Sequence, residues 1–104
     1  MKKRITSFGS LEPLLIRDGK IVTELAIFNS NGKSHQHNQW EICYVLAGEG
    51  RIIKDEEAGY FGALKETYEV KTGAVIKLPP NTGHWMEVDK DNTMEILLVY
   101  SDIS

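Results

Sequence analysis

The stretch E-I-C-Y-V-L-A, residues 41–47, decides the fold class of this chain. Side chains alternate between the two faces of a β-strand, so the odd-numbered residues from Glu41 share one face and the even-numbered residues from Ile42 share the other. Both faces are apolar beyond Glu41. A strand of this kind is covered on both sides. Because a small barrel has only one interior, we expect a second layer over the outer face, either another sheet or a partner subunit.

Similar strand patterns recur along the whole chain. Runs rich in β-branched and aromatic residues predict strands at residues 20–28, 41–47, 51–53, 67–71, 74–78, 84–88 and 94–100. Turn residues separate them at 29–32, 48–50, 72–73, 79–83 and 89–92, and Asp18-Gly19 predicts a hairpin turn after the apolar run 14–16. Residues 55–66 show no clear period and predict a long loop or hairpin tip, in which Tyr60 and Phe61 could close over a cavity. Short strands at this spacing predict an all-β sandwich or barrel.

Length and composition set the broad class. A chain of 104 residues with 41% hydrophobic and 26% charged residues fits one soluble globular domain, 1–104. The net charge of −3 offers no basic surface for nucleic acid. No apolar run is long enough to span a membrane, and the basic start, residues 2–4, is not followed by the apolar segment of a secretory signal. With a single cysteine, Cys43, the composition predicts a cytoplasmic protein.

The histidines of this chain gather in two short segments. His35 and His37 lie in S-H-Q-H-N-Q-W-E, which ends at Glu41, and His84 ends the segment P-P-N-T-G-H. If residues 35–41 are extended, the two histidines and Glu41 point the same way. Imidazole and carboxylate together suit divalent transition metals. Taken alone, the H-x-H-x-x-x-E spacing fits a solvated loop equally well.

The two histidine segments resemble the paired motifs of the cupin superfamily. The first motif runs from His35-x-His37 through three residues to Glu41 and six further residues to Gly48, although the leading glycine is displaced to Gly32. The second motif runs from Gly73 through five residues to Pro79, with His84 five positions beyond Pro79. Two positions depart from the pattern: Asn81 occupies a glycine position that calls for positive φ, and Val88 replaces the closing asparagine.

The resemblance implies a small jelly-roll-like β-barrel with a metal inside. Its core would span about residues 20–100, with residues 1–19 as an N-terminal strand or arm. The implied ligands are His35, His37, Glu41 and His84, and the implied cofactor is one divalent transition metal ion such as Mn, Fe, Ni or Zn. The resemblance also suggests a homodimer.

Four further side chains near the motifs are candidates for a role at the site. Cys43 shares a face with Glu41 and could line the metal cavity, although a small buried core residue is the favoured interpretation. Tyr100 ends an apolar strand face, and its hydroxyl could reach a ligand, although a core position is favoured. Arg51 and Lys77 are the cations nearest the motifs and could hold an anionic substrate, although surface positions are favoured.

Two functions fit these observations. The first is a metalloenzyme, of isomerase, lyase or dioxygenase type, that acts on a small oxygen-rich metabolite such as a carbohydrate or organic acid. The alternative is a non-catalytic module that binds or senses a small molecule. The fold does not choose between them, because one fold supports many chemistries.

Overall fold

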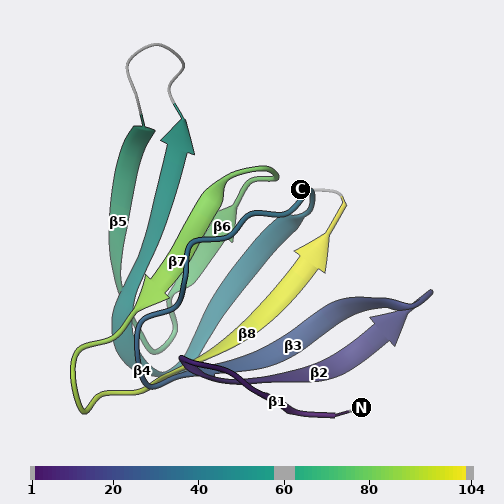
Figure 1. The fold of residues 1–104 in the computed structure, drawn as a ribbon, viewed down its shortest axis with the longest axis horizontal. Helices are drawn as coiled ribbons and strands as arrows, with labels where there is room; N and C mark the ends of the chain where they lie inside the picture. Colours follow the sequence, from purple (N-terminus) through teal and green to yellow (C-terminus); the bar gives the residue numbers. More distant parts are fainter. Residues whose placement is uncertain (1, 58–62, 103–104) are drawn as a thin grey trace.

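A computed structural model of the chain describes residues 2–57 and 63–102, and every regular element in these residues is a β-strand. The eight strands in chain order are β1 (Arg4–Ile5), β2 (Gly9–Arg17), β3 (Lys20–Phe28), β4 (Trp40–Glu57), β5 (Ala63–Lys71), β6 (Val75–Leu78), β7 (Gly83–Glu87) and β8 (Met94–Ser101) (Figure 1). All pairings between them are antiparallel. The prediction of an all-β, jelly-roll-like barrel is confirmed.

The long strand β4 belongs to two sheets. Its first half pairs with β8 on one side and β6 on the other, and β8 continues the sheet through β3 and β2 to β1. Its second half pairs with β5 and β7. In Figure 1 the β2–β3 and β4–β5 hairpins point away from each other, while β6 and β7 lie beside β4. The inner faces of the two sheets enclose the core.

The N-terminal residues join the main sheet. β2 pairs with β3 from Gly9 opposite Phe28 to Arg17 opposite Lys20. Asp18 and Gly19 adopt φ angles of 52° and 77°, as the tight hairpin turn requires, so the predicted turn is confirmed. This pairing places Leu11 of β2 in the wall of the cavity described below.

Two predicted interruptions are wrong. Residues 48–50 do not break the chain into two strands, because β4 continues through them from one sheet into the other. Gly48 has φ 86°, and a register shift lies between Val45 and Ala47, so the strand bends here without ending. The predicted interruption at 55–66 is also too long, since residues 55–57 and 63–66 are paired strand, but the alternative interpretation of this segment as a hairpin tip is confirmed by the pairing of β4 with β5. Tyr60 and Phe61, the predicted lid residues, lie outside the described residues.

The core follows the alternation expected of the strands. Cys43 and Val45 are fully buried on the inner face of β4, together with Ile96 from β8 and Ala26 from β3. The outer face of β4 is different, because Tyr44 and Leu46 remain 42% and 41% exposed in the single chain. Among the described residues, no helix is long and apolar enough to cross a membrane.

The bend of β4 provides a stability prediction. A Cβ at Gly48 would lie 2.1 Å from the backbone oxygen of Thr93, and φ 86° is a conformation that L side chains rarely adopt. We expect Gly48→Ala to lower the free energy of unfolding by about 2–4 kcal/mol. Gly73 is a matched control, because its φ is also positive, at 95°, but a Cβ there would meet no atom within 4 Å.

Urea unfolding of both variants measures the difference. Gly73→Ala bears only the backbone strain and should cost about 1 kcal/mol. Equal losses in the two variants would contradict the close packing of β4 against the turn before β8.

Candidate metal centre

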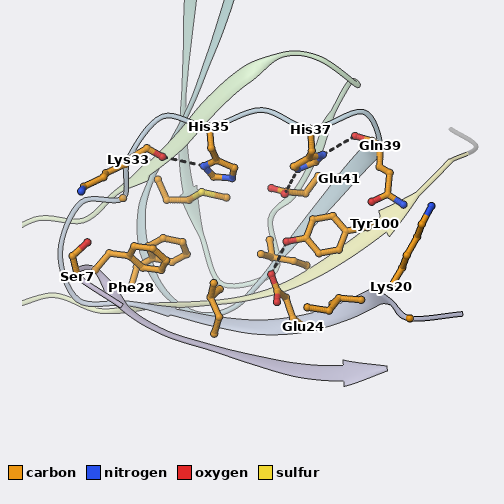
Figure 2. A pocket seen from close by; sticks show the side chains of 17 residues that line it. Ser7, Lys20, Glu24, Phe28, Lys33, His35, His37, Gln39, Glu41 and Tyr100 are labelled. Carbon is orange, nitrogen blue, oxygen red and sulfur yellow. Dashed lines mark hydrogen bonds and ion pairs between the residues drawn. The ribbon is translucent and has the colours of Figure 1, made fainter. Parts of the chain in front are cut away.

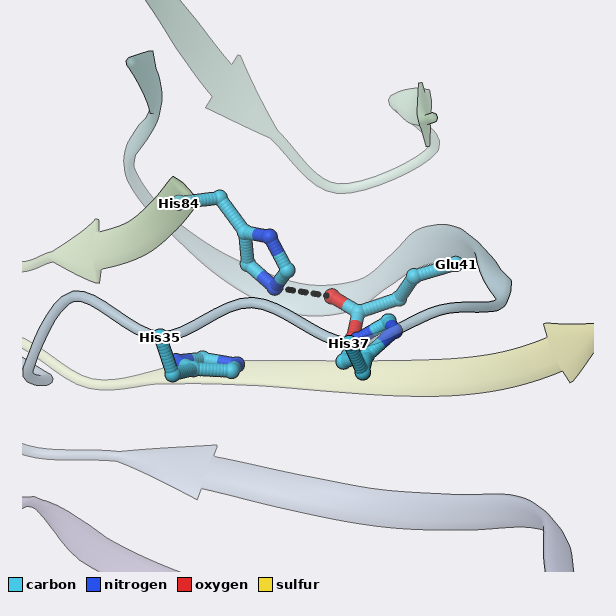
Figure 3. Close-up of side chains that lie close together, drawn as sticks. All are labelled: His35, His37, Glu41 and His84. Atoms are coloured by element: carbon cyan, nitrogen blue, oxygen red, sulfur yellow. Dashed lines mark hydrogen bonds and ion pairs between the residues drawn. The ribbon is translucent and has the colours of Figure 1, made fainter. Parts of the chain in front are cut away.

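Four side chains from three parts of the chain converge at one wall of the barrel interior. His35 and His37 come from the loop between β3 and β4, Glu41 from the start of β4, and His84 from β7 (Figure 3). Each offers one ligand atom, and these atoms all lie within 4.8 Å of one another. The structure therefore brings together the four residues that the two sequence motifs singled out, and the cluster could hold a metal ion.

Backbone hydrogen bonds hold the loop that carries His35 and His37. The amide of His35 donates to the carbonyl of His84 at 3.1 Å, and the amide of His84 donates back at 2.9 Å, so the loop adds a bridge beside β7. The amide of Asn81 donates to the carbonyl of His37 at 2.7 Å. Asn81 has φ 59°, as expected for the residue in the glycine position of the motif. These bonds join the two histidine segments directly.

The three imidazole rings share one hydrogen-bonding pattern. Nδ1 of His35, His37 and His84 lies 3.0–3.1 Å from the carbonyl oxygen of a residue two positions away in the chain: Lys33, Gln39 and Thr82, respectively. A carbonyl oxygen can only accept, so each ring donates its Nδ1–H. A second partner of this kind fixes both the tautomer and the ring orientation of a metal-ligating histidine. The Nε2 atoms are therefore the nitrogens available for a metal.

Glu41 is a fully buried carboxylate at the centre of the cluster. Its Oε1 lies 2.9 Å from Nε2 of His37, and its Oε2 accepts from the thiol of Cys43 at 3.3 Å. Burial alone would raise the pKa of Glu41, but the contacts with His37 and His84 outweigh it and lower the pKa to about 2. Burial, with the neighbouring Glu41, raises the pKa of Cys43, so the thiol keeps its proton. Cys43 is thus both a core residue and a hydrogen-bond donor to the candidate ligand.

His84 has a buried nitrogen without a hydrogen-bond partner. The side chain of His84 is only 1% exposed. Its Nε2 lies 3.3 Å from Oε2 of Glu41, close enough for charge attraction, yet it makes no hydrogen bond. A buried polar atom without a partner is costly and calls for an explanation. A metal ion bound by this nitrogen would satisfy it, so the donor set fits a divalent transition metal.

The cluster forms part of the wall of a cavity of about 620 Å³, within the size range of small-molecule sites (Figure 2). Leu11 of β2, Phe28 of β3, Met86 of β7 and Leu98 of β8 provide apolar walls. His35, His37 and Glu41 line it on the side of the β3–β4 loop. A ligand in this cavity could therefore contact a metal and an apolar surface at the same time.

The structure adds one polar pair to the site and places the two cations nearest the motifs outside it, in line with the surface positions favoured for them. Tyr100 lines the cavity, and its hydroxyl donates to Oε1 of Glu24 at 2.6 Å. Glu24 was missed, although it is the one acidic residue among the inward positions of an otherwise apolar strand, and that interruption was a usable signal. Arg51 and Lys77 do not line the cavity. The cations that do are Lys20 and Lys33.

Comparison with known proteins agrees with this architecture. A family model described as "Cupin domain" matches residues 27–100. An uncharacterised protein of Methanocaldococcus jannaschii is 30% identical over 105 aligned residues, which cover 84% of this chain and 77% of that protein.

Two solved structures show the same fold. The oxalate decarboxylase of Lactobacillus farciminis, in a formate complex, matches with a TM-score of 0.75 and 19% identity over 97% of this chain and 31% of that one. The capsular polysaccharide assembling protein CapF of Staphylococcus aureus matches with a TM-score of 0.76 and 17% identity over 98% of this chain and 29% of that one. This chain spans about a third of each, and at such identities the likeness shows the fold alone.

The His37–Glu41 contact predicts how metal affinity depends on pH. The hydrogen bond with Glu41 raises the pKa of His37 above its ordinary value of 6.5, so the metal-free protein keeps a proton there to a higher pH than a free imidazole does. This proton stabilises the metal-free fold fully below pH 6.5, and its contribution is lost as pH rises through the raised pKa. A metal must displace it, so we expect metal affinity to fall as pH decreases through the raised pKa of His37.

Isothermal titration of Zn²⁺ between pH 5.5 and 8 tests this dependence. Glu41 stays ionised throughout that range, so the histidines set the profile. Glu41→Gln removes the charge that holds the proton on His37, and it should weaken binding while moving the midpoint to lower pH. An affinity that stays constant over the whole range would contradict histidine ligation.

Proposed function

The chain belongs to the cupin family, and from that premise we propose that it is a metal-dependent enzyme acting on a small oxygen-bearing metabolite. One observation carries the proposal: the candidate ligand atoms of His35, His37, Glu41 and His84 lie within 4.8 Å of one another beside a cavity of about 620 Å³. Glu41 and His84 are buried, His37 is partly buried and His35 is exposed, so the cluster runs from the barrel interior to the mouth of the cavity, where a ligand could reach it.

Each residue of the proposed site has a defined task. The Nε2 atoms of the three histidines and one oxygen of Glu41 would hold one divalent ion, and three nitrogens with one carboxylate suit Mn, Fe, Ni or Zn. The bound ion would supply Lewis-acid chemistry on a carbonyl or carboxylate, or would activate water or dioxygen. Carbonyl acceptors at Nδ1 orient the rings, and Cys43 orients Glu41. The apolar walls exclude water from the reacting end of the ligand.

A non-catalytic binding or sensing module is the second candidate. It is favoured by the pairing of Tyr100 with Glu24, because the two polar groups that could transfer a proton to a ligand are hydrogen-bonded to each other. Such a pair can hold a ligand without reacting with it. The two functions differ in turnover, not in binding.

A metal and turnover experiment separates the two functions. Protein purified without an affinity tag is analysed for metal and then incubated with uronates, keto sugars, hydroxy acids and phenolics, with product analysis and oxygen uptake. We expect His35→Ala to lower metal affinity at least about tenfold and to abolish turnover, while Lys33→Ala, at a neighbouring exposed position of the cavity wall, retains metal. Metal-loaded protein that binds a compound tightly but never converts it would support the binding module.

We further propose that the chain forms a homodimer through the outer face of its larger sheet. An outer patch, defined by Ile42, Tyr44, Leu46, Val75, Leu97 and Val99, supports this. Tyr44 of β4 pairs with Leu97 of β8 on one side and with Val75 of β6 on the other. Tyr44, Leu46 and Val75 are 42%, 41% and 56% exposed. Monomeric proteins rarely leave a contiguous apolar patch of this kind uncovered. A second copy covers it with the same patch about a twofold axis.

Light scattering tests the dimer. Leu46→Glu places a charge in the centre of the outer patch and should convert the dimer into a folded monomer, because a buried unpaired charge costs several kcal/mol. Thr67→Glu adds the same charge at an exposed position of β5 on the other sheet and should leave the dimer intact. A wild-type protein that is monomeric at all concentrations would contradict the proposal.

A further inference from the structure

The hydrogen-bonded pair of Tyr100 and Glu24 shapes what the cavity can recognise. We propose that Tyr100, set by Glu24, is a specificity-determining residue, and that the ligand is a small hydroxylated aromatic compound with adjacent oxygens, rather than a dicarboxylate or a sugar. The inference deepens the proposed function and rests on metal binding at the same site. It concerns the wall of the cavity that β3 and β8 supply.

The first step of the argument is the direction of one hydrogen bond. Glu24 is a carboxylate, 4% exposed, whose Oε1 accepts the Tyr100 hydroxyl at 2.6 Å and whose Oε2 accepts Arg4 at 3.3 Å. The tyrosine proton is therefore committed to Glu24. Only the lone pairs of the Tyr100 oxygen remain for a ligand. A ligand must bring its own hydrogen-bond donor to this wall.

The other polar side chains that line the cavity do not supply a hydrogen-bond donor beside Tyr100. Gln39 also lines the cavity, but its amide nitrogen donates to Asp102 at 3.3 Å. Lys20 and Lys33 are exposed residues, and Figure 2 shows them at the two ends of the cavity, away from its centre. The ring of His37 lies beside that of Tyr100, with centroids 5.3 Å apart, but its Nδ1–H already donates to the carbonyl of Gln39 and its Nε2 is a candidate metal ligand, so with a metal bound it offers no free donor here.

The second step is the apolar character of the remaining wall. Leu98 lies two residues before Tyr100 on the same face of β8, and Leu11, Phe28 and Met86 complete the surface. Phe28 also stacks on Phe8, with ring centroids 4.6 Å apart, so this end of the cavity is aromatic. A flat apolar ring would bury its faces here, whereas the hydroxyl groups of a sugar would lose their hydrogen bonds to water without replacement.

The two steps together select a class of ligand. The metal end requires oxygen lone pairs, the Tyr100 wall requires a donor, and the rest of the cavity requires an apolar body. A dicarboxylate meets only the first requirement, and it would bring negative oxygens toward Tyr100 and Glu24. A hydroxylated aromatic ring with adjacent oxygens meets all three when one oxygen is bound to the metal and the neighbouring hydroxyl keeps its proton and donates it to Tyr100.

Calorimetric titration of Zn²⁺-loaded protein under nitrogen tests the preference with three probes: catechol, oxalate and gluconate. Zinc is not redox-active, so binding is measured without conversion. We expect catechol to bind most tightly. Tyr100→Phe keeps the ring but removes the acceptor, and it should weaken catechol about tenfold while changing oxalate less than about twofold.

Two companion variants separate recognition from a structural effect. Tyr68→Phe is the matched control, because Tyr68 also donates to a glutamate, Glu66, but lies outside the cavity. It should change neither affinity. Glu24→Gln offers Tyr100 an amide donor and frees its hydroxyl to point into the cavity, so the ratio of catechol to oxalate affinity should fall.

The outcomes are distinguishable. Tighter binding of oxalate or gluconate than of catechol to zinc-loaded wild type would overturn this inference and leave the metal site standing. Equal weakening of catechol and oxalate by Tyr100→Phe would show that Tyr100 only supports the fold, and would also overturn it. Failure of the wild-type protein to bind Zn²⁺ would overturn the proposed function itself.

Discussion

The burial of the Glu41 carboxylate is the constraint on which the site depends. An isolated charge inside a protein costs several kcal/mol, so this carboxylate must be matched by donors or by a cation. In the structure His37, His84 and Cys43 surround it. The match is incomplete, because Nε2 of His84 has no hydrogen-bond partner and the carboxylate raises the pKa of His37, which favours an extra proton on that ring. A divalent ion would replace that proton and engage the free nitrogen, and the arrangement is therefore better suited to a metal than to a static polar core.

Strand pairing brings the candidate ligands to within a few ångströms of one another. Because β4 bends at Gly48, it belongs to both sheets. Glu41, in its first half, pairs with β8 and β6, and the second half pairs with β7, which carries His84. The bridge between His35 and His84 then fixes the loop from β3. Each ligand thus depends on contacts distant in the chain, and the cavity forms where the two sheets and this loop meet.

Some of this arrangement could be predicted from the sequence and some could not. The strand predicted at residues 20–28 has the same bounds as β3, and Asp18-Gly19 correctly predicted the turn between β2 and β3. Both predictions succeeded because they depend only on residues that are neighbours in the chain. The strand break expected at 48–50 was wrong, because a glycine allows a strand to bend and continue as readily as it allows the strand to end. Glu24 and Tyr100 could not be paired beforehand, since their contact depends on the register between β3 and β8, which is set across 76 residues of chain.

The central claim is that three histidines and one glutamate bind a single metal ion. X-ray absorption spectroscopy of the zinc-loaded protein tests it directly, because the scattering of imidazole rings distinguishes histidine nitrogen from other light ligands. The account predicts three imidazole nitrogens and a carboxylate oxygen at about 2.0–2.2 Å from zinc. A spectrum with one imidazole or none, or with a sulfur ligand from Cys43, would contradict the account.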